Sequence, residues 1–213
     1  MEGFTSGKSG AGVGEAPEEM KTGTTTVGIV AEGGVVLATD RRASLGGRCV
    51  SNKNAETIIE VHPSAAITIS GSVGAGQTFA DQLQAQTSLY ETRRGKEMSM
   101  EALSTTAANA IRGMRVVPLL GGVDGSGGHL YSLDPAGGLM EDTYGATGSG
   151  MQMAYGVLEG EYKDGMSMDE AEEAALKAVK AASARDTASG NGALVAHITS
   201  DGIEREELSA EEL

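Results

Sequence analysis

Residues 23–40 read Gly-Thr-Thr-Thr-Val-Gly-Ile-Val-Ala-Glu-Gly-Gly-Val-Val-Leu-Ala-Thr-Asp. Two stretches rich in β-branched residues, 24–30 and 35–40, flank a short turn sequence at 31–34. β-branched residues favour strands, and the Glu-Gly-Gly of the turn supplies the positive φ values that a tight hairpin needs. This run therefore predicts a strand, a tight turn and a second strand where the ordered part of the chain begins.

Beyond this hairpin, the spacing of apolar residues changes several times. It predicts short strands, then two helices, then strands, two more helices and a last strand. The expected strands cover residues 48–52, 57–61, 65–70, 117–123, 129–133, 139–142 and 193–199, and the expected helices cover the segment from Phe79 to Arg94 and residues 100–112, 151–162 and 168–185. A turn is expected at residues 44–47, and Ser99 and a Ser167-x-x-Glu170 capping box are expected to begin the helices 100–112 and 168–185. Runs of strands followed by runs of helices favour antiparallel sheets covered by helices, an α+β layered sandwich.

Composition and charge exclude several classes of function. The 213 residues include 30 Asp and Glu against 16 Lys and Arg, a formal net charge of −14, which argues against binding nucleic acid or anionic lipid. The longest apolar stretches are far shorter than the roughly 20 residues of a membrane-spanning helix. A single cysteine and the lack of Asn-x-Ser/Thr sites fit a reducing cytoplasm. A salt-adapted host and an ordinary acidic cytosolic protein both explain the acidic excess.

The two ends of the chain differ from its middle. Residues 1–23 are rich in Gly and Ser without apolar periodicity, which predicts a disordered leader and not a secretory signal. Residues 204–213 are acidic and are expected to form a solvated tail. One domain is therefore expected over residues 24–203.

Glycine-rich motifs that invite a nucleotide-binding interpretation have the wrong spacing. Residues 3–9 place three residues between their glycines where a phosphate-binding loop has four, and no strand is predicted before them. Residues 71–76 join a predicted strand to a helix, but their glycines are not spaced as Gly-x-Gly-x-x-Gly. Nucleotide binding is therefore not expected.

The histidines and the cysteine offer little more. His62, His129 and His197 are scattered, with no Cys pair or His-x-x-x-His spacing nearby, so neither a metal nor an organic cofactor is expected. A Cys49–His nucleophile stays open from sequence, although Cys49 lies on a predicted strand where small buried cysteines are common.

The segment Gly23-Thr24-Thr25 carries the strongest chemical signal. A threonine hydroxyl is a poor nucleophile until a base removes its proton, and a chain terminus carries such a base, an α-amine with a pKa of roughly 7.7–8.0. Cleavage of the Gly23–Thr24 bond would create this arrangement, and the leader would keep the hydrolase silent until then. Taken alone, three threonines are also ordinary strand composition.

Several motifs in this order resemble the β subunits of archaeal 20S proteasomes, most of all the haloarchaeal members. They extend from Gly23 to about Asp201, nearly the whole ordered chain. The motifs are Gly-Thr-Thr-Thr-Val-Gly-Ile from Gly23, Ala38-Thr-Asp40-Arg41-Arg42-Ala43, Ser70-Gly71-Ser-Val-Gly74, Gly148-Ser149-Gly150 and Arg185-Asp186-x-x-Ser189-Gly190. The resemblance implies a four-layer αββα sandwich, the fold of the N-terminal nucleophile hydrolases.

The resemblance also implies roles for individual residues. Thr24 becomes the nucleophile and the first residue after removal of the leader, and Gly71 offers its N–H to the developing oxyanion. Asp40 sets the charge beside the nucleophile, while Ser149, Asp186 and Ser189 orient the threonine amine and hydroxyl. The alternative roles are an ion pair of Asp40 with Arg41 or Arg42, a plain turn at Gly71, a helix N-cap at Ser149 and a helix-end polar group at Asp186.

The substrate and the assembly follow from the same resemblance. Ala43, Ile69 and Val73 match an apolar specificity pocket, which implies chymotrypsin-like cleavage after large hydrophobic residues. The family implies stacked seven-membered rings of α and β subunits, fed with unfolded polypeptide by an ATPase ring that contacts the α subunits. A different N-terminal nucleophile amidase, acting on small amides without an α ring, remains a further alternative.

One position departs from the family pattern. The family's catalytic lysine lies on the strand that precedes a His-Pro pair. Here Thr57 occupies that place, or Glu56 if a one-residue insertion near Gly46-Gly47 is placed further along the chain. Lys53 lies four strand residues away, about 13 Å, too far to substitute. A missing cation weakens the electrostatics of such a site, so an inactive structural β subunit is the second hypothesis.

Overall fold

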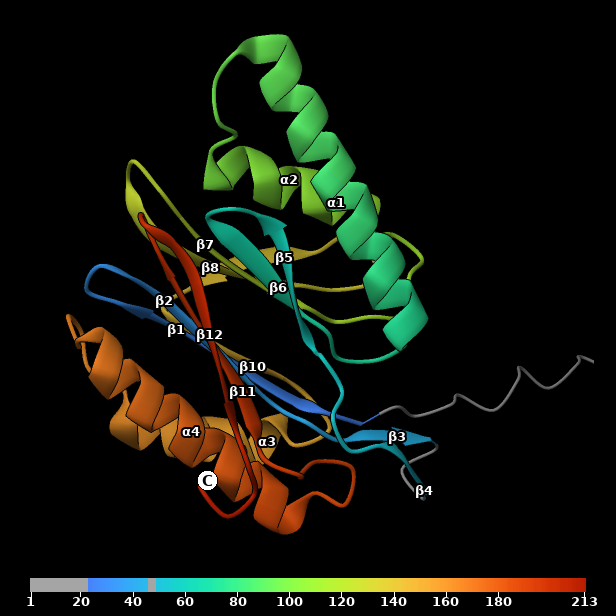
Figure 1. Ribbon diagram of the computed structural model, residues 1–213, viewed down its shortest axis with the longest axis vertical. Coiled ribbons are helices and arrows are strands. Elements are labelled where there is room, and N and C mark those ends of the chain that lie inside the picture. The colour runs from blue at the N-terminus through green and yellow to red at the C-terminus, as the bar shows by residue number, and fades with distance from the viewer. Residues whose placement is uncertain (1–22, 46–48) are drawn as a thin grey trace, which may run out of the picture.

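The computed structural model describes residues 23–45 and 49–213. The expected leader falls almost entirely outside these residues, as does Arg48 of the predicted strand 48–52. The chain forms two five-stranded antiparallel sheets that lie face to face, with a pair of helices outside each sheet (Figure 1). The expected α+β sandwich of antiparallel sheets flanked by helices is confirmed.

The first sheet has the strand order β10-β1-β2-β11-β12. Its strands are β1 (Thr25–Ala31), β2 (Gly34–Asp40), β10 (Tyr144–Gly148), β11 (Ala193–Thr199) and β12 (Gly202–Leu208). The predicted hairpin joins β1 to β2, with Gly33 at φ +93° in its turn. All seven residues of β2 are buried, because one face of this strand meets helices and the other meets the second sheet.

The second sheet has the strand order β5-β6-β7-β8-β9. Its strands are β5 (Ile58–His62), β6 (Ala65–Thr68), β7 (Leu119–Asp124), β8 (Gly127–Leu133) and β9 (Leu139–Asp142). A two-stranded hairpin, β3 (Ala43–Leu45) with β4 (Cys49–Asn52), lies beside the sandwich (Figure 1). The sequence predicted a turn from Ser44, but Ser44 belongs to β3.

The α-helices of the described residues form the outer layers. They are α1 (Val73–Arg94), α2 (Met100–Ala110), α3 (Met151–Glu161) and α4 (Met168–Arg185). The predicted N-caps are confirmed: the Ser99 side chain accepts from Ala102 N, and Ser167 and Glu170 form a reciprocal capping box on α4. None of the helices in the described part of the chain is long and apolar enough to cross a membrane.

Three hydrophobic clusters separate the four layers. The clusters lie between the second sheet and α1 with α2, between the first sheet and α3 with α4, and between the two sheets. Representative members are Phe79 and Leu103 for the first, Val27 and Val179 for the second, and Leu37 and Leu130 for the third. The sheets approach so closely that a Cβ on Gly28 would lie 2.5 Å from a methyl of Leu130. A core on both faces of each sheet holds the strands of the site rigidly.

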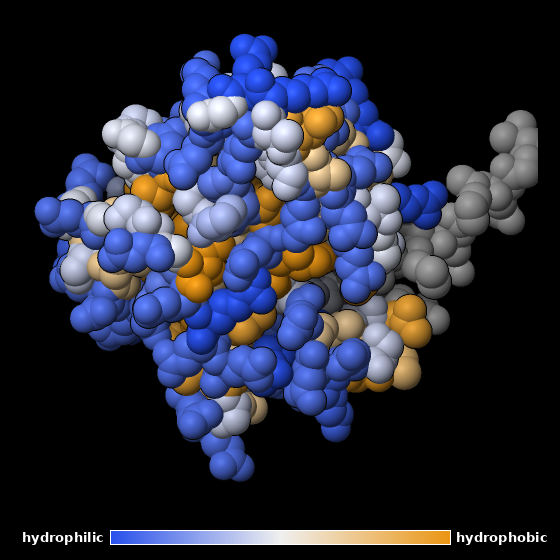
Figure 2. Space-filling model, turned by 45° about the horizontal axis from the view of Figure 1, so that its top comes forward, coloured by the Kyte–Doolittle hydropathy of each residue, from blue (hydrophilic) through white to orange (hydrophobic). Residues whose placement is uncertain are grey.

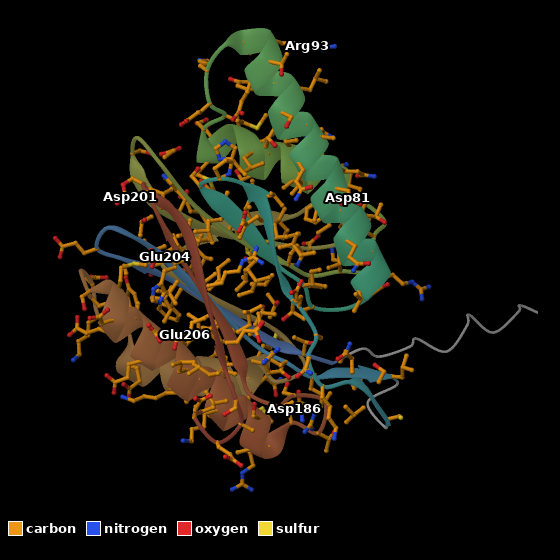
Figure 3. The ribbon with its side chains drawn as sticks, in the orientation of Figure 1. Asp81, Arg93, Asp186, Asp201, Glu204 and Glu206 are labelled. Atoms are coloured by element: carbon orange, nitrogen blue, oxygen red, sulfur yellow. The ribbon has the colours of Figure 1, made fainter. Side chains whose placement is uncertain are left out.

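The acidic C-terminal segment corrects the expectation of a free tail. Residues 202–208 form β12, which pairs with β11 in continuous register from Thr199–Gly202 to Ala193–Leu208. Leu213 packs on the cluster beneath α3 and α4, and its carbonyl accepts from Lys180 Nζ at 2.6 Å. The acidic side chains of β12, Glu204 and Glu206 among them (Figure 3), stay exposed on this edge strand, while its apolar residues Ile203 and Leu208 pack on the hydrophobic clusters.

The molecular surface is mostly hydrophilic on the face shown in Figure 2, with smaller hydrophobic areas between the polar side chains. Exposed large apolar residues occur at several separate places on the described chain. They include Leu45, Val50, Val73, Leu89, Met140 and Tyr155. Leu45 and Val73 also border the site considered next.

Candidate active site

Thr24 lies immediately before β1 and is buried. Its Oγ1 is 2.7 Å from the carbonyl oxygen of Gly23 and 3.3 Å from that of Arg42. Ser149 N donates to the Thr24 carbonyl at 3.0 Å, which continues the pairing of β1 with β10 by one residue. The hydroxyl is thus fixed against the peptide group that links Gly23 to Thr24.

Asp40 ends β2 beside the start of β1. Its Oδ1 accepts from Thr25 N at 2.7 Å, and its Oδ2 accepts from Arg42 N at 3.0 Å and from Gly190 N at 2.7 Å. Burial raises the pKa of Asp40 to about 6, which these three backbone donors oppose and the charge of Asp186 reinforces. Asp40 therefore organises three chain segments around Thr24 through their main-chain N–H groups.

The two arginines after Asp40 direct their guanidinium groups elsewhere. Arg41 pairs with Glu207 at 2.8 Å, while Arg42 donates to Asn191 Oδ1 at 2.8 Å and to the Thr187 carbonyl at 2.9 Å. The alternative role of Asp40, an ion pair with one of these side chains, is thus not seen. Arg42 contributes its backbone N–H to Asp40 and holds the loop after α4 with its side chain.

Asp186 follows the last residue of α4 (Figure 3). Its Oδ2 accepts from Ser149 Oγ at 2.5 Å and from Ser189 Oγ at 2.7 Å, and its Oδ1 accepts from Ala188 N at 3.1 Å. The N-cap of α3 is Gly150 without a side-chain bond, so Ser149 is not the helix cap of the alternative interpretation. Asp186 does close the end of α4, and its carboxylate serves the serines in addition.

Gly71 connects β6 to α1 and has a φ of +116°, a conformation that disfavours any other residue. A Cβ at this position would lie 2.6 Å from the Arg115 carbonyl oxygen. Its N–H donates to no backbone acceptor within residues 23–45 and 49–213, whereas the neighbouring Ser72 N donates to Arg115. Gly71 thus carries a spare hydrogen-bond donor on the wall of the cavity described next.

A cavity of about 220 Å³ opens beside Thr24. The three residues expected to form an apolar specificity pocket, Ala43, Ile69 and Val73, all line it. Sequence reasoning missed several other lining residues, because the β3–β4 hairpin brings them in by tertiary packing. Among the described residues, the lining consists of Gly23, Thr24, Ala43, Ser44, Leu45, Ser51, Thr57, Ile69, Gly71, Ser72 and Val73.

Thr57 lines the same cavity from the residue before β5. Its Oγ1 lies 2.6 Å from Thr39 Oγ1 and 3.4 Å from the carbonyl oxygen of Asp40, and it is 2% exposed. The side chain at this position therefore borders both Asp40 and the space in front of Thr24. Lys53 is exposed on the segment after β4 and does not line this cavity.

Cys49 and the described histidines form neither a nucleophile pair nor a metal site. Cys49 is exposed on β4, contrary to the expectation of burial, and pairs in register with Leu45. His62 contacts Glu91 at 2.7 Å and His197 contacts Glu172 at 2.9 Å, so each of these histidines pairs with a carboxylate of a neighbouring helix. In the described ranges no three His, Cys, Asp or Glu side chains converge in a way that suits a metal ion.

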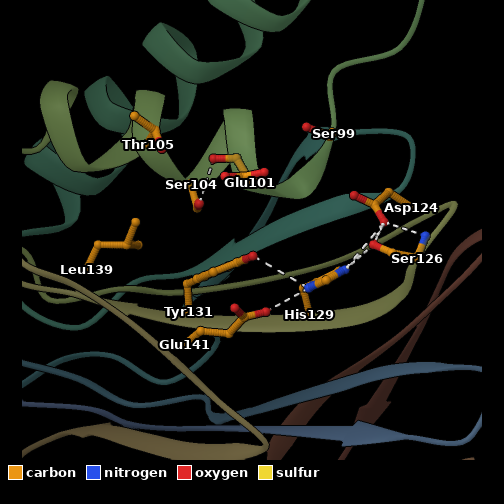
Figure 4. A pocket seen from close by; sticks show the side chains of 10 residues that line it. All are labelled: Ser99, Glu101, Ser104, Thr105, Asp124, Ser126, His129, Tyr131, Leu139 and Glu141. Atoms are coloured by element: carbon orange, nitrogen blue, oxygen red, sulfur yellow. Dashed lines mark hydrogen bonds and ion pairs between the residues drawn. The ribbon is translucent and has the colours of Figure 1, made fainter.

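A larger cavity of about 520 Å³ lies apart from Thr24, between α2, β8 and β9 (Figure 4). His129 Nε2 is 2.9 Å from Ser126 Oγ, and His129 Nδ1 is 2.7 Å from Glu141 Oε1. The hydroxyl of Ser126 donates to Asp124 Oδ1 at 2.5 Å, so its proton is directed to a carboxylate and not to the imidazole. This arrangement lacks the serine-to-histidine donation that activates a nucleophile.

Comparison with known proteins agrees with this geometry. Residues 20–198 match the family described as proteasome subunit. The chain is 57% identical to "Proteasome subunit beta" of Halorhabdus utahensis over 92% of this chain and 85% of that protein. It is 58% identical to the protein of the same name in Halobacterium salinarum, over 86% and 76%, and 53% identical to "Proteasome subunit beta 1" of Haloarcula marismortui, over 90% and 85%. This chain belongs to the proteasome subunit family.

Proposed function

We propose that this chain is a β subunit of a 20S proteasome core and a threonine-type endopeptidase with Thr24 as its nucleophile. The observation that carries the proposal is the convergence of Gly71, Ser149 and Asp186 with its serine partners on the Gly23–Thr24 peptide. Together with the Gly23–Thr24 peptide, these residues come from four separate stretches of the chain, and each presents a group that an acyl-transfer site requires.

The first proposed reaction removes the leader. Thr24 Oγ1 attacks the Gly23 carbonyl carbon, the bond from that carbon to Thr24 N breaks, and water then hydrolyses the resulting ester. The hydroxyl already lies 2.7 Å from this carbonyl's oxygen. The products are a chain ending at Gly23 and a mature chain of 190 residues that begins with the free amine of Thr24, since 213 − 23 = 190.

The second proposed reaction is peptide hydrolysis by the mature chain. The Thr24 amine accepts the hydroxyl proton, the alkoxide attacks the substrate carbonyl, and the Gly71 N–H stabilises the oxyanion. Ser149 donates its only proton to Asp186, which leaves its oxygen lone pairs free to accept a bond from the amine. The apolar wall of Ala43, Ile69 and Val73 favours a large hydrophobic residue before the cleaved bond.

The relatives' names, proteasome subunit beta, support assembly into a proteasome core. The further details of the proposed setting rest on the family resemblance of the sequence motifs. Stacked seven-membered rings of α and β subunits enclose the site in the cytoplasm, and an ATPase ring on the α subunits supplies unfolded polypeptide. No metal or organic cofactor is required by the proposed reaction, because the nucleophile, the base and the oxyanion donor all belong to this chain.

Thr57 favours a second candidate function, that of a structural β subunit without activity. Within the described residues no Lys or Arg side chain makes an ion pair or hydrogen bond with the buried Asp40 carboxylate. A neutral hydroxyl at position 57 leaves the developing charge near Thr24 without a fixed cation, and such electrostatic support is usually worth several kcal/mol.

Coexpression with an α subunit separates the two functions. For the active enzyme we expect an intact mass that lacks residues 1–23 and turnover of a fluorogenic peptide with a bulky apolar residue before the scissile bond. A full-length, inert chain in assembled rings would support the structural subunit. Thr57→Lys is then expected to raise the rate by at least about tenfold, because its ammonium would enter the cavity in front of Thr24. An unchanged rate would contradict the role given to position 57.

A further inference from the structure

Thr25, the residue after the proposed nucleophile, makes hydrogen bonds toward both carboxylates of the site. Its backbone N–H donates to Asp40 Oδ1 at 2.7 Å, and its Oγ1 lies 2.7 Å from Ser189 Oγ. Thr25 is completely buried at the start of β1. Strand formation needs no hydroxyl at this position, so the side-chain bond requires its own explanation.

Counting protons gives this hydrogen-bond chain a direction. A serine hydroxyl has one proton, and that of Ser189 is donated to Asp186 Oδ2 at 2.7 Å. Ser189 Oγ can therefore only accept in its contact with Thr25, so the Thr25 hydroxyl is the donor. The chain runs from Thr25 through Ser189 to the Asp186 carboxylate, and each donor strengthens the next.

The same oxygen of Asp186 also accepts from Ser149 Oγ. Ser149 in turn touches the reacting peptide: its N–H donates to the Thr24 carbonyl at 3.0 Å, and its Oγ would lie 2.9 Å from a Cβ placed on Gly23. A shift of the Asp186 carboxylate would move Ser149 Oγ relative to the bond between Gly23 and Thr24. The Thr25 hydroxyl is the last group in this chain of hydrogen bonds, which runs from Ser149 through Asp186 and Ser189.

Neighbouring residues confine the Thr25 hydroxyl so that it points toward Ser189. A Cβ on Gly150 would overlap Thr25 Oγ1 and would lie 2.8 Å from the Ala182 side chain. Glycine at position 150 therefore lets the start of α3 approach the hydroxyl and α4 closely. The hydroxyl is enclosed by β1, α3 and the loop after α4, which fixes its orientation toward Ser189.

We propose that the Thr25 hydroxyl is a positioning group for the reaction at Thr24. It donates to Ser189, thereby holds the Asp186 carboxylate in place, and so fixes the oxygen of Ser149 beside the Gly23–Thr24 peptide. Thr25 touches no substrate in this role. The inference rests on the proposed peptidase function and adds to it a residue that follows the nucleophile directly.

The test compares two adjacent buried threonines in the assembled α–β complex. Thr25→Val removes the hydroxyl with little change of volume, and Thr25→Ser retains it. Thr26→Val is the matched control, because Thr26 is equally buried and its Oγ1 lies 2.7 Å from Thr147 Oγ1, outside the carboxylate network. For each variant we would measure the intact mass over time, kcat and KM with the fluorogenic peptide, and the melting temperature.

We expect Thr25→Val to lower kcat by about tenfold, to slow removal of the leader and to leave KM unchanged, since the hydroxyl lies outside the substrate cavity. Thr25→Ser should stay within about twofold of the unaltered chain, and Thr26→Val should keep its kcat. A wild-type kcat in Thr25→Val, or an equal loss in Thr26→Val, would overturn the inference. If the valine variant does not assemble, Thr25→Ala replaces it with the same expectation.

An inactive unaltered chain would contradict the proposed function but would not decide the role of Thr25. In that case the positions are tested by a double-mutant cycle of Thr25→Val and Ser189→Ala in thermal unfolding of the complex. The two losses of melting temperature are expected to be less than additive in the double variant, because either change removes the same bond. Strict additivity would show that the two hydroxyls do not act together and would end the proposal.

Discussion

Gly23 is the residue at which space is most restricted around the candidate site. A Cβ added there would overlap the Ala188 side chain and would lie 2.9 Å from Ser149 Oγ and 3.2 Å from Ser44 Oγ. Its N–H also donates to Ser44 Oγ at 3.1 Å. The residue before Thr24 is therefore confined from three sides, and its carbonyl is held beside the threonine hydroxyl.

Gly23→Ala is expected to slow removal of the leader by about a hundredfold, because displacement of a reacting group by about 1 Å costs that much. Time-resolved intact mass spectrometry of freshly assembled complex measures the rate. Gly156→Ala on α3 is the control, since a Cβ there meets no atom within 4 Å. Equal processing of the two variants would mean that the crowding at Gly23 has no influence on the reaction.

Asp40 links the site to the pH dependence of stability. Its pKa of about 6 lies above the ordinary 3.8, so the folded state binds more protons than the unfolded state between these values. The free energy of unfolding contributed by this group is complete below pH 3.8 and falls as the pH rises toward 6. In urea unfolding between pH 4 and pH 7, we expect the free energy of unfolding of Asp40→Asn to fall less steeply with pH than that of the unaltered protein. Parallel curves for the two proteins would exclude the raised pKa.

At the scale of elements, the sequence predicted those helices and turns that short-range interactions determine. The β1–β2 hairpin follows from Gly33 in its turn, and α4 follows from Ser167 and Glu170 at its start. Thr24 could be singled out from the chemistry of a threonine that cleavage would place at a chain terminus, whereas Asp40 was identified only through the family resemblance. The start and end of α4 matched the predicted residues 168 and 185. The capping box fixes the start, and Asp186, whose N–H donates to the Ala182 carbonyl, closes the end shortly before the glycines at 190 and 192.

The sequence did not predict strands that are held mainly by backbone hydrogen bonds to a neighbouring strand. β10 and β12 have few apolar residues in alternation, yet each completes an edge of the first sheet through backbone bonds to β1 or β11. The region of β3 was predicted as a turn, because this short strand is defined by its pairing with β4 and not by an alternation of apolar residues. The cavity residues Ser44, Leu45 and Ser51 could not be foreseen, since only the placement of that hairpin beside Thr24 gives them a function.

The capping box of α4 supports a measurable contribution to stability. Ser167 Oγ accepts from Glu170 N at 3.3 Å, and Glu170 Oε2 accepts from Ser167 N at 2.9 Å. Ser167→Ala is expected to lower the free energy of unfolding by about 1 kcal/mol in denaturant titration. Ser99→Ala on α2 should cost less, because Ala102 at the equivalent position returns no bond to the cap. A larger loss at Ser99 would contradict this assignment.

For the whole molecule, the dominant electrostatic property is the net charge of −14. Carboxylates on the exposed strand β12 and on the helix surfaces repel one another, and this repulsion destabilises the compact state at low salt. The two sheets share an exposed ion pair, Arg205 with Glu60 at 3.2 Å, which offsets little of this effect.

The melting temperature is therefore expected to rise as KCl increases from about 0.05 M to about 0.5 M, a range in which screening shortens to a few ångströms. The same titration near pH 4.6, the sequence isoelectric point, should show a much smaller rise because the repulsion has vanished. An equal rise at both pH values would assign the salt effect to something other than net charge.

The β3–β4 hairpin offers a final practical consequence. Cys49 is the chain's single cysteine, stands exposed on β4, and pairs with Leu45 on the wall of the cavity. A thiol-reactive fluorophore would consequently attach to each copy of the chain at one place, a strand away from the entrance. Its emission would report the arrival and departure of peptides without a cleavable substrate, so occupancy of the cavity becomes visible even in a subunit that cuts nothing.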